Sequence, residues 1–400
     1  ACANEHFSGQ GMRVLGFAYK VTENSSADTE DNYIFIGLVA MTDPPRPESK
    51  AAVADCIRAG IKPVMITGDH KVTASAIARE IGIMRDGDIS LDGVQLDAMT
   101  DEELDGMIEK VSVYARVSPD NKIRIVDRWQ SKGKIVAMTG DGVNDAPALK
   151  KADVGVAMGI TGTQVSKDAA SMILTDDNFA TIIKSVANGR AIYANIKNAV
   201  KFLLSGNLAA IIAVLCTAIP GLPAPFTAVQ LLFINLLTDS LPAIAISTER
   251  ADRSLLSQKP RDSKSSFLTK AMSVRIVAGG VLIALAVMSA YFIGSAVSSG
   301  LACAMAFTTL CTARLFHGFN CRGDKSLFSL GITANKFSLL AFFAGIVLLC
   351  LAVFVPGVSD LFGTKIMNIS NFGITLLLGF APTFLIQTVR VIKEAFAKKK

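Results

Sequence analysis

Six long apolar runs in the second half of the chain restrict its fold more than any other feature. They cover residues 198–219, 226–247, 272–297, 299–319, 337–356 and 371–389. Each run is close to the ~20 residues that an α-helix needs to cross the hydrocarbon core of a bilayer. We therefore predict six transmembrane helices, with the lipid bilayer as a partner of this half of the chain.

Basic residues are distributed unevenly among the connections between these runs. Connections 248–270 and 320–336 each carry several lysines and arginines, and the chain ends in three lysines, 398–400. Connections 220–225 and 298 carry none, and 357–370 carries only Lys365. Positively charged loops stay on the cytoplasmic side, so the C-terminus and the first half of the chain are both expected in the cytoplasm. The net charge of +6 thus reflects topology, and we expect no nucleic-acid partner.

The first half of the chain has the pattern of a water-soluble α/β domain. Expected helices over 48–59, 71–81, 101–108, 119–130 and 146–151 alternate with short strands over 62–66, 113–116, 135–138 and 154–157. This alternation predicts a parallel sheet with both faces covered by helices. An earlier apolar segment, 33–41, predicts a buried strand. It ends at 42–47, where two adjacent prolines mark a domain junction.

Two apolar strands run into the same turn, Thr-Gly-Asp, at 64–69 (VMITGD) and 136–141 (VAMTGD). Ligands bind at the carboxyl ends of parallel strands, where glycine lets the backbone approach a phosphate and helix N-termini supply free N–H groups. The hard ion Mg²⁺ prefers oxygen ligands, and lysine meets phosphate as a point charge. A repeated, extended turn favours a phosphate and metal site over simple helix capping. The candidate residues are Asp141, Asn144, Asp145 and Lys122.

A second candidate site lies inside the apolar run 226–247. Asn235, Thr238 and Asp239 are spaced i, i+3 and i+4, which places them on one face of a helix. A carboxylate in mid-membrane indicates function, and Pro242 loosens the helix so that backbone carbonyls are freed. Ligands that are all oxygens suit a hard cation rather than Cu⁺ or Zn²⁺. The alternative is a structural polar cluster between helices.

Three of these motifs resemble those of the P-type ATPases: Thr67-Gly68-Asp69, Asp43-Pro44-Pro45-Arg46 and the segment 139–147 (TGDGVNDAP). The resemblance implies an α/β haloacid-dehalogenase-like (Rossmann-like) cytoplasmic domain followed by an α-helical membrane domain with six transmembrane helices. It also implies four parts. These are the end of a nucleotide-binding domain (1–41), the phosphorylation domain (42–178), a stalk with two membrane helices and the ion site (179–247), and four further membrane helices (248–400).

The same resemblance assigns roles to individual residues. Asp141 would bind the catalytic Mg²⁺, helped by Asn144 and Asp145. The phosphoryl oxygens would be held by Lys122 and by Thr67 and Gly68. The positions that match ATP-binding residues are Arg13, Asp69 and Arg116.

The 400 residues contain neither Asp-Lys-Thr-Gly-Thr, which carries the phosphorylated aspartate of the family, nor Thr-Gly-Glu, which drives dephosphorylation. In the family both motifs precede the part that this chain resembles. We therefore expect a fragment that is inactive alone and that needs the missing N-terminal part of the same pump. A bacterial plasma membrane is the expected location.

The string Asn-x-x-Thr-Asp-x-x-Pro is similar to the sixth membrane helix of calcium pumps of the sarcoplasmic-reticulum and secretory-pathway type. In the preceding run, Asn207 matches a calcium ligand, while Ala210 stands where two-site pumps carry a glutamate. Arg314 stands where those pumps carry another carboxylate. The resemblance therefore implies one Ca²⁺ per ATP, with Arg314 as a tethered cation beside Asp239. Alternatively, Arg314 extends to the cytoplasmic interface.

Other functions remain compatible with the sequence. The transported ion could be Mn²⁺ or a monovalent cation, since the sequence limits only the hardness of the ligands. A membrane protein with a phosphatase head is a second possibility, although it requires a nucleophile that the chain does not display. A non-catalytic regulatory fragment is a third.

Overall fold

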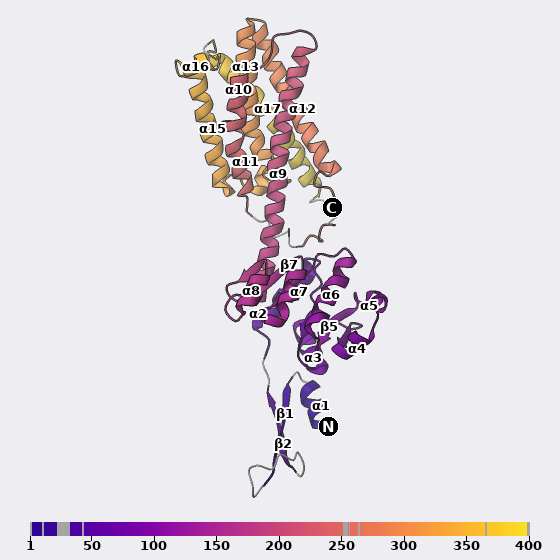
Figure 1. Ribbon diagram of the computed structural model, residues 1–400. Coiled ribbons are helices and arrows are strands. Elements are labelled where there is room, and N and C mark those ends of the chain that lie inside the picture. The colour runs from indigo at the N-terminus through magenta and orange to yellow at the C-terminus, as the bar shows by residue number, and fades with distance from the viewer. Residues whose placement is uncertain are drawn as a thin grey trace. The chain divides into compact units, whose positions relative to one another are not determined.

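The computed structural model describes residues 2–9, 12–21, 33–41, 44–250, 255, 257–262, 265–364 and 366–397. The chain divides into two compact units (Figure 1). The first comprises Ala1–Ala187 with Arg253–Lys264, and the second comprises Asn188–Asp252 with Ser265–Lys400. Each unit has its own core and is described separately.

The first unit begins with helix α1 (Cys2–Gly9) and an antiparallel ribbon of strands β1 (Arg13–Tyr19) and β2 (Ile34–Met41). Segment 33–41 contains a strand, as expected, but the expectation that this strand is buried was wrong. Phe35 and Ile36 are each 65% exposed. Helix α1 contacts β1, but in the described part of the chain the ribbon has only two strands, and most of its large apolar side chains stay exposed.

The rest of the first unit is built from parallel strands, as predicted. The strands are β3 (Met65–Thr67), β4 (Ile89–Asp92), β5 (Val111–Ala115), β6 (Ala137–Gly140), β7 (Val154–Met158) and β8 (Met172–Leu174). Their hydrogen bonds form two sets, in the orders β3-β5-β4 and β6-β7-β8, rather than one continuous ladder. The sequence did not predict β4 and β8, which have four and three residues and, unlike β3 and β6, do not run into a Thr-Gly-Asp turn that marks the strand end.

Helices surround these strands and begin at recognisable caps. They are α2 (Pro47–Arg58), α3 (Lys71–Ile81), α4 (Gly93–Ala98), α5 (Asp101–Met107), α6 (Pro119–Ser131), α7 (Ala146–Lys151) and α8 (Gln164–Ala169), with a 3₁₀ turn η1 (Val143–Asp145) before α7. Ser118 caps α6 by accepting a hydrogen bond from the Asn121 N–H, and Thr100 forms a capping box with Glu103. Leu96, Leu104 and Tyr114, all fully buried, form the core beside β5.

Six helical segments, which lie in the second unit except for residues 179–187 at the start of the first helix, are long and apolar enough to span a membrane, which confirms the hydropathy prediction. They are α9 (Phe179–Ala218), a composite of α10 (Ala228–Phe233), a π turn η2 (Ile234–Thr238) and α11 (Ser240–Ser247), then α12 (Lys270–Ser295), α13 (Ser299–Asn320), α15 (Lys336–Phe354) and α17 (Ile369–Ala397). Short turns α14 (Leu327–Leu330), η4 (Ile332–Ala334) and α16 (Val358–Leu361) connect them. Lys365 and lysines 398–400, used in the topology argument, lie outside the described residues.

Helix α13 is the central helix of this bundle. It packs against α11, α12, α15 and α17 (Figure 1). In its most apolar stretch of 18 residues, 78% is buried. Small residues allow this close packing: a Cβ on Gly379 of α17 would lie 2.1 Å from the Thr312 hydroxyl. Buried polar side chains need hydrogen-bond partners, and those of α13 find them both on their own helix, as Thr308 does at the Ala304 carbonyl, and on neighbouring helices.

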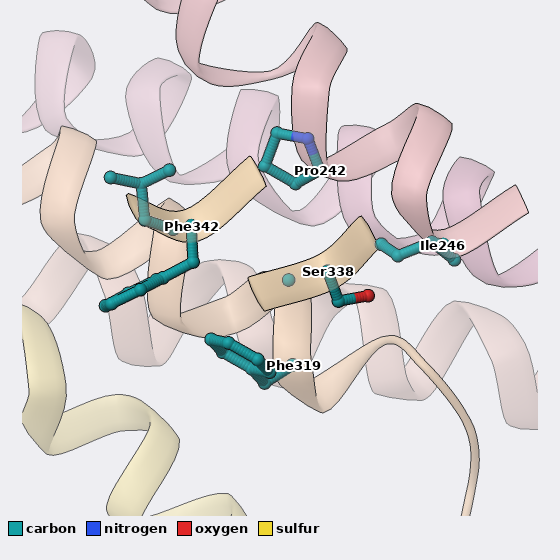
Figure 2. Close-up of a pocket in the computed structure, with 7 residues that line it drawn as sticks. Pro242, Ile246, Phe319, Ser338 and Phe342 are labelled. Carbon is teal, nitrogen blue, oxygen red and sulfur yellow. The ribbon is translucent and has the colours of Figure 1, made fainter. Parts of the chain in front are cut away.

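A small cavity lies where α11, α13 and α15 meet, around Pro242, Phe319 and Phe342 (Figure 2). Its volume of about 10 Å³ is close to the space of a single water molecule. The buried Ser338 hydroxyl, which lines it, has no hydrogen-bond partner among the residues that the structure describes. The cavity is therefore too small for an ion with its ligands or for an organic molecule.

Candidate functional sites

The two Thr-Gly-Asp turns begin in one apolar core. Ile66 and Met138, each directly before the threonine of a turn, belong to the same hydrophobic cluster. Thr67 pairs with Ala115 in the parallel ladder of β3 and β5, so Gly68 and Arg116 follow at the same carboxyl edge. The structure thus brings together the first turn and Arg116, as a parallel sheet with a ligand at its carboxyl edge requires.

Arg116 adopts a left-handed backbone conformation, with φ of 48°. Such a conformation is uncommon outside glycine and is typical of functional turns. A Cβ on Gly93 would lie 2.4 Å from the Arg116 carbonyl oxygen, so α4 can start here only with glycine. The exposed Arg116 side chain is available to a ligand at this edge.

The second turn is organised around the buried carboxylate of Asp145. Its Oδ2 accepts hydrogen bonds from the backbone N–H groups of Asp141 (3.2 Å) and Gly142 (3.1 Å). A Cβ on Gly140 would lie 2.4 Å from the Asp145 Cβ, so glycine is needed at this position. These contacts fold the loop back onto the start of α7 and fix the position of the Asp141 backbone.

Lys122 at the start of α6 forms an ion pair with Asp145. The Nζ–Oδ1 distance is 2.5 Å, and the two side chains are 16% and 11% exposed. Burial by itself would raise the pKa of Asp145, but hydrogen bonds from Lys122 and the Gly142 N–H outweigh burial and lower the pKa. Asp145 is thus ionised at neutral pH and holds the lysine ammonium at the mouth of the turn.

The carbonyl oxygen of Asp141 is fixed by two further residues that the sequence did not indicate. It accepts hydrogen bonds from the Thr163 N–H at 2.8 Å and from the Ser166 hydroxyl at 3.0 Å. Thr163 is also the N-cap of α8. The Thr-x-x-Ser spacing of a helix cap was the signal that could have revealed this support.

The exposed side chains of Asp141 and Asn144 suit a magnesium ion, which usually takes one or two carboxylates and completes its shell with phosphate and water. The oxygens of Asp145 already have the three partners described above, so its expected role as a magnesium ligand stays a prediction. In the first turn, the Thr67 hydroxyl and the Asp69 carboxylate hydrogen-bond to each other at 3.1 Å. The predicted phosphate and nucleotide contacts of these residues also stay predictions.

Two of the predicted features lie outside the described residues. Arg13 belongs to β1, but its side chain is not among them, and neither is Asp43 of the Asp-Pro-Pro-Arg motif. Arg46 of that motif donates a hydrogen bond to the Asp177 carbonyl oxygen at 3.1 Å. The motif therefore fastens the start of this domain to its end.

Asp177 is the second non-glycine residue with a left-handed backbone, with φ of 47°. Its carboxylate accepts hydrogen bonds from the Ile160 N–H (2.9 Å) and the Thr161 N–H (2.8 Å). These bonds lower the pKa of Asp177 to about 2. The carboxylate thus fixes the loop between β7 and α8, the helix whose first turn supports Asp141.

In the second unit, the predicted ion-site residues of three helices meet. The Arg314 guanidinium of α13 forms an ion pair with the Asp239 carboxylate, and the two side chains are 1% and 3% exposed. The same guanidinium donates a hydrogen bond to Asn207 Oδ1 of α9 at 3.0 Å. Arg314 therefore does not extend to the interface, and its charge is compensated inside the bundle.

A glycine makes room for this arginine. A Cβ on Gly206 of α9 would lie 2.4 Å from Arg314 Nε and 2.6 Å from Cζ. Asp239 Oδ1 and Arg314 Nε remain buried without a hydrogen-bond partner in the described part of the chain. An unpaired carboxylate oxygen beside a groove is a ready ligand for a cation.

The π turn changes the predicted geometry of the second membrane segment. The Asp239 N–H bonds to the Ile234 carbonyl at 2.9 Å, a step of five residues rather than four. Asn235 and Asp239 line a groove of about 410 Å³ together with Asn207. Thr238 does not line it, because its buried hydroxyl donates to the Ile234 carbonyl. The expectation that 235, 238 and 239 share one α-helical face was therefore wrong, because a π turn has a longer period.

Two family models and several known proteins match this chain. Residues 15–153 match the model of haloacid dehalogenase-like hydrolases, and residues 223–392 match the C-terminus of cation transporting ATPases. A calcium-transporting ATPase of Listeria monocytogenes is 46% identical over 405 residues, covering 99% of this chain and 45% of the relative.

Along nearly its whole length this chain is similar to calcium-transporting ATPases. Calcium-transporting ATPase 1 of Lactococcus lactis is 49% identical over 356 residues, 88% of this chain and 40% of that protein. The calcium-transporting ATPase type 2C member 1 of Bos taurus is 36% identical over 387 residues, 96% of this chain and 40% of that protein. The chain thus spans less than half the length of these relatives.

Proposed function

We propose that this chain is part of a pump that moves Ca²⁺ across a membrane, driven by ATP through an aspartyl-phosphate intermediate, with one Ca²⁺ per ATP. The observation that carries the proposal is the buried Asp239 carboxylate, which pairs with Arg314 through one oxygen and leaves the other free. The names of the relatives, which are calcium-transporting ATPases, support the choice of ion.

At the ion site, the amide oxygens of Asn207 and Asn235 and the free oxygen of Asp239 form a set of hard ligands for Ca²⁺. A guanidinium keeps its proton at any working pH, so Arg314 cannot leave and return as a transported ion does. In this proposal Arg314 permanently fills the place of a second cation. Its charge holds Asp239 in position, and the low dielectric of the bundle strengthens that attraction.

In the head, bound Mg²⁺ would neutralise charge on the transferring phosphoryl group, and Asp141 with Asn144 would hold that ion. Asp145 orients the Lys122 ammonium toward the same mouth, where it would bind phosphoryl oxygens. Thr67 and Gly68 would hold the same group from the first turn. Arg116 and Asp69, together with Arg13, would contact the nucleotide.

The membrane assignment extends the same proposal. The six spans support an integral membrane protein, with the head and the C-terminus in the cytoplasm according to the charge of the connections. Bacterial relatives support a bacterial plasma membrane. The missing N-terminal part of the pump, ATP and the lipid bilayer are the partners in this proposal.

Equilibrium binding of ⁴⁵Ca to the complete pump tests the stoichiometry. We expect one Ca²⁺ per phosphorylatable site, with competition by Mn²⁺ and monovalent cations measured in parallel to test the ion. Two bound ions per site would refute the role of Arg314, and preferential binding of another ion would refute the choice of Ca²⁺. Arg314→Ala should weaken Ca²⁺ binding, because Asp239 loses its only ion-pair partner among the described residues.

A further inference from the structure

A buried histidine next to the ion site has partners on both ring nitrogens. His317 lies on α13, one turn after Arg314, and is 5% exposed. Its Nε2 is 2.9 Å from the Ser205 hydroxyl of α9, and its Nδ1 is 3.3 Å from the amide nitrogen of Asn320. The ring stacks on Phe202, with centroids 6.4 Å apart and planes inclined by 22°. The imidazole therefore has a polar partner on each ring nitrogen and an aromatic ring against one face.

The direction of the hydrogen bonds around His317 can be traced from a group with a fixed role. The Leu327 backbone N–H can only donate, and it donates to Gln387 Oε1 at 2.9 Å. Gln387 Nε2 must then donate to Asn320 Oδ1, at 2.8 Å. The Asn320 amide nitrogen consequently faces Thr383 at 2.9 Å and His317 Nδ1.

This order determines which ring nitrogen carries the proton. Nδ1 accepts from Asn320, so in neutral imidazole the proton is on Nε2 and is donated to Ser205. The Ser205 hydroxyl in turn donates to the carbonyl oxygen of Lys201, at 2.8 Å. Each donor and acceptor in this series is thus assigned, from the start of α14 at Leu327 to the backbone of α9. Side-chain amides pass protons poorly, so the chain of bonds joins helices rather than conducting protons.

The series of hydrogen bonds ends on α9 next to the proposed ion site. Ser205 directly precedes Gly206, against which the Arg314 guanidinium packs, and Asn207, which accepts its hydrogen bond. Gly279 of α12 leaves the space for the ring, since a Cβ there would lie 3.1 Å from His317 Cε1. The bond between Ser205 and His317 therefore sets the spacing of α9 and α13 one turn from Arg314.

We propose that His317, as the neutral Nε2–H tautomer, is a positioning residue that clamps α9 to α13 and thereby aligns Asn207 and Arg314 around Asp239. The inference rests on the proposed Ca²⁺ site, which it deepens. His317 does not touch the ion. Its effect reaches the site through the backbone of residues 205–207 on α9.

Paired variants in the complete pump test the clamp. Glutamine places its amide nitrogen near the position of Nε2, whereas asparagine places it near Nδ1. His317→Gln should therefore keep Ca²⁺ affinity within about threefold of wild type, whereas His317→Asn should lower it about tenfold. Maximal turnover at saturating Ca²⁺ should fall much less than the affinity.

Ser205→Ala and Ser338→Ala form a matched control, because both remove a buried hydroxyl from the same bundle. Only the Ser205 hydroxyl bonds to His317, so only Ser205→Ala should weaken Ca²⁺ binding. Equal affinities in these two variants would overturn the inference, as would equal effects of His317→Gln and His317→Asn.

A spectroscopic measurement reads the tautomer in the wild-type protein and uses one conservative variant for assignment only. ¹⁵N-histidine NMR of the wild-type pump, with His317 assigned by its loss in His317→Gln, should show a protonated Nε2 and an unprotonated Nδ1 at pH 7. The opposite tautomer or an imidazolium would overturn the inference even if Ca²⁺ binding is confirmed. Absence of Ca²⁺ binding in the wild type would instead overturn the proposed function, while the tautomer would still be tested.

Discussion

Gly206→Ala isolates the contact between α9 and the Arg314 guanidinium. The added methyl carbon would lie 2.4 Å from Nε, 2.6 Å from Cζ and 2.6 Å from the terminal nitrogen that bonds Asn207. Carbon contacts are ordinarily about 3.5 Å long, so the guanidinium would have to retreat by about 1 Å. It cannot do so freely, because it is bonded to Asp239 and Asn207.

The expected loss of Ca²⁺ affinity follows from the interactions that this displacement of the guanidinium weakens. Overpacking costs about 1–3 kcal/mol, and complete loss of a buried ion-pair partner would cost about 3–5 kcal/mol. If only the overpacking cost falls on the ion-bound geometry, Ca²⁺ affinity should decrease by about 5- to 150-fold. We expect the complete pump with Gly206→Ala to show this loss in ⁴⁵Ca equilibrium binding and to unfold at a lower temperature in detergent.

Gly189→Ala is the matched control on the same helix. A Cβ there meets nothing within 4 Å, and alanine favours a helix over glycine by about 1 kcal/mol. This variant should bind Ca²⁺ as the wild type does and be equally or slightly more stable. If Gly206→Ala behaves like Gly189→Ala, the arginine is not confined against α9 and the account of the site is wrong.

Three further predictions concern the head of the complete pump. Asp141→Asn should lower phosphoenzyme formation from labelled ATP by about 10²-fold or more while ⁴⁵Ca binding persists, because Mg²⁺ loses a charged ligand; wild-type turnover would remove Asp141 from the mechanism. Asp145→Asn should slow the same step to a similar extent, since Lys122 loses its ion pair, and an unchanged rate would contradict that role. Asp177 stabilises the head above pH ~4, its unfolded pKa, and this contribution is lost as the pH falls toward its folded pKa of about 2. Asp177→Asn should therefore lower the unfolding temperature at pH 7, with a difference that shrinks toward pH 2; a constant difference would argue against it.

The sequence predicted features that depend on local pattern and length. The six membrane spans follow from runs of apolar residues, and the helices of the soluble domain follow from their alternation with short apolar strands. The turn at Asp141 was recognisable as a candidate site because its motif is long. By contrast, the exposure of β2 depends on what covers the ribbon, which no local pattern records.

Other parts of the sites depend on partners far apart in sequence. The polar residues His317 and Asn320 interrupt an apolar run without indicating that their partners lie on α9 and α17. The support of the Asp141 carbonyl by Ser166 depends on where α8 packs. Burial of Arg314 was expected only from the resemblance of its position to a family position. Its contact with Gly206 depends on how α9 and α13 pack, which the sequence does not record.

The π turn at Ile234–Thr238 makes the second membrane segment sensitive to its exact residue count. Its hydrogen bond from Asp239 to Ile234 encloses one residue more than an α-helical turn. Deleting a single residue within 234–238 would let the segment close into a continuous α-helix. The flanking residues would keep nearly the same orientation, because a π turn of five residues and an α-helical turn of four cover almost the same rotation. A deletion at 236, 237 or 238 would instead place Asn235 three rather than four residues before Asp239, and so would change the spacing of two proposed ion ligands.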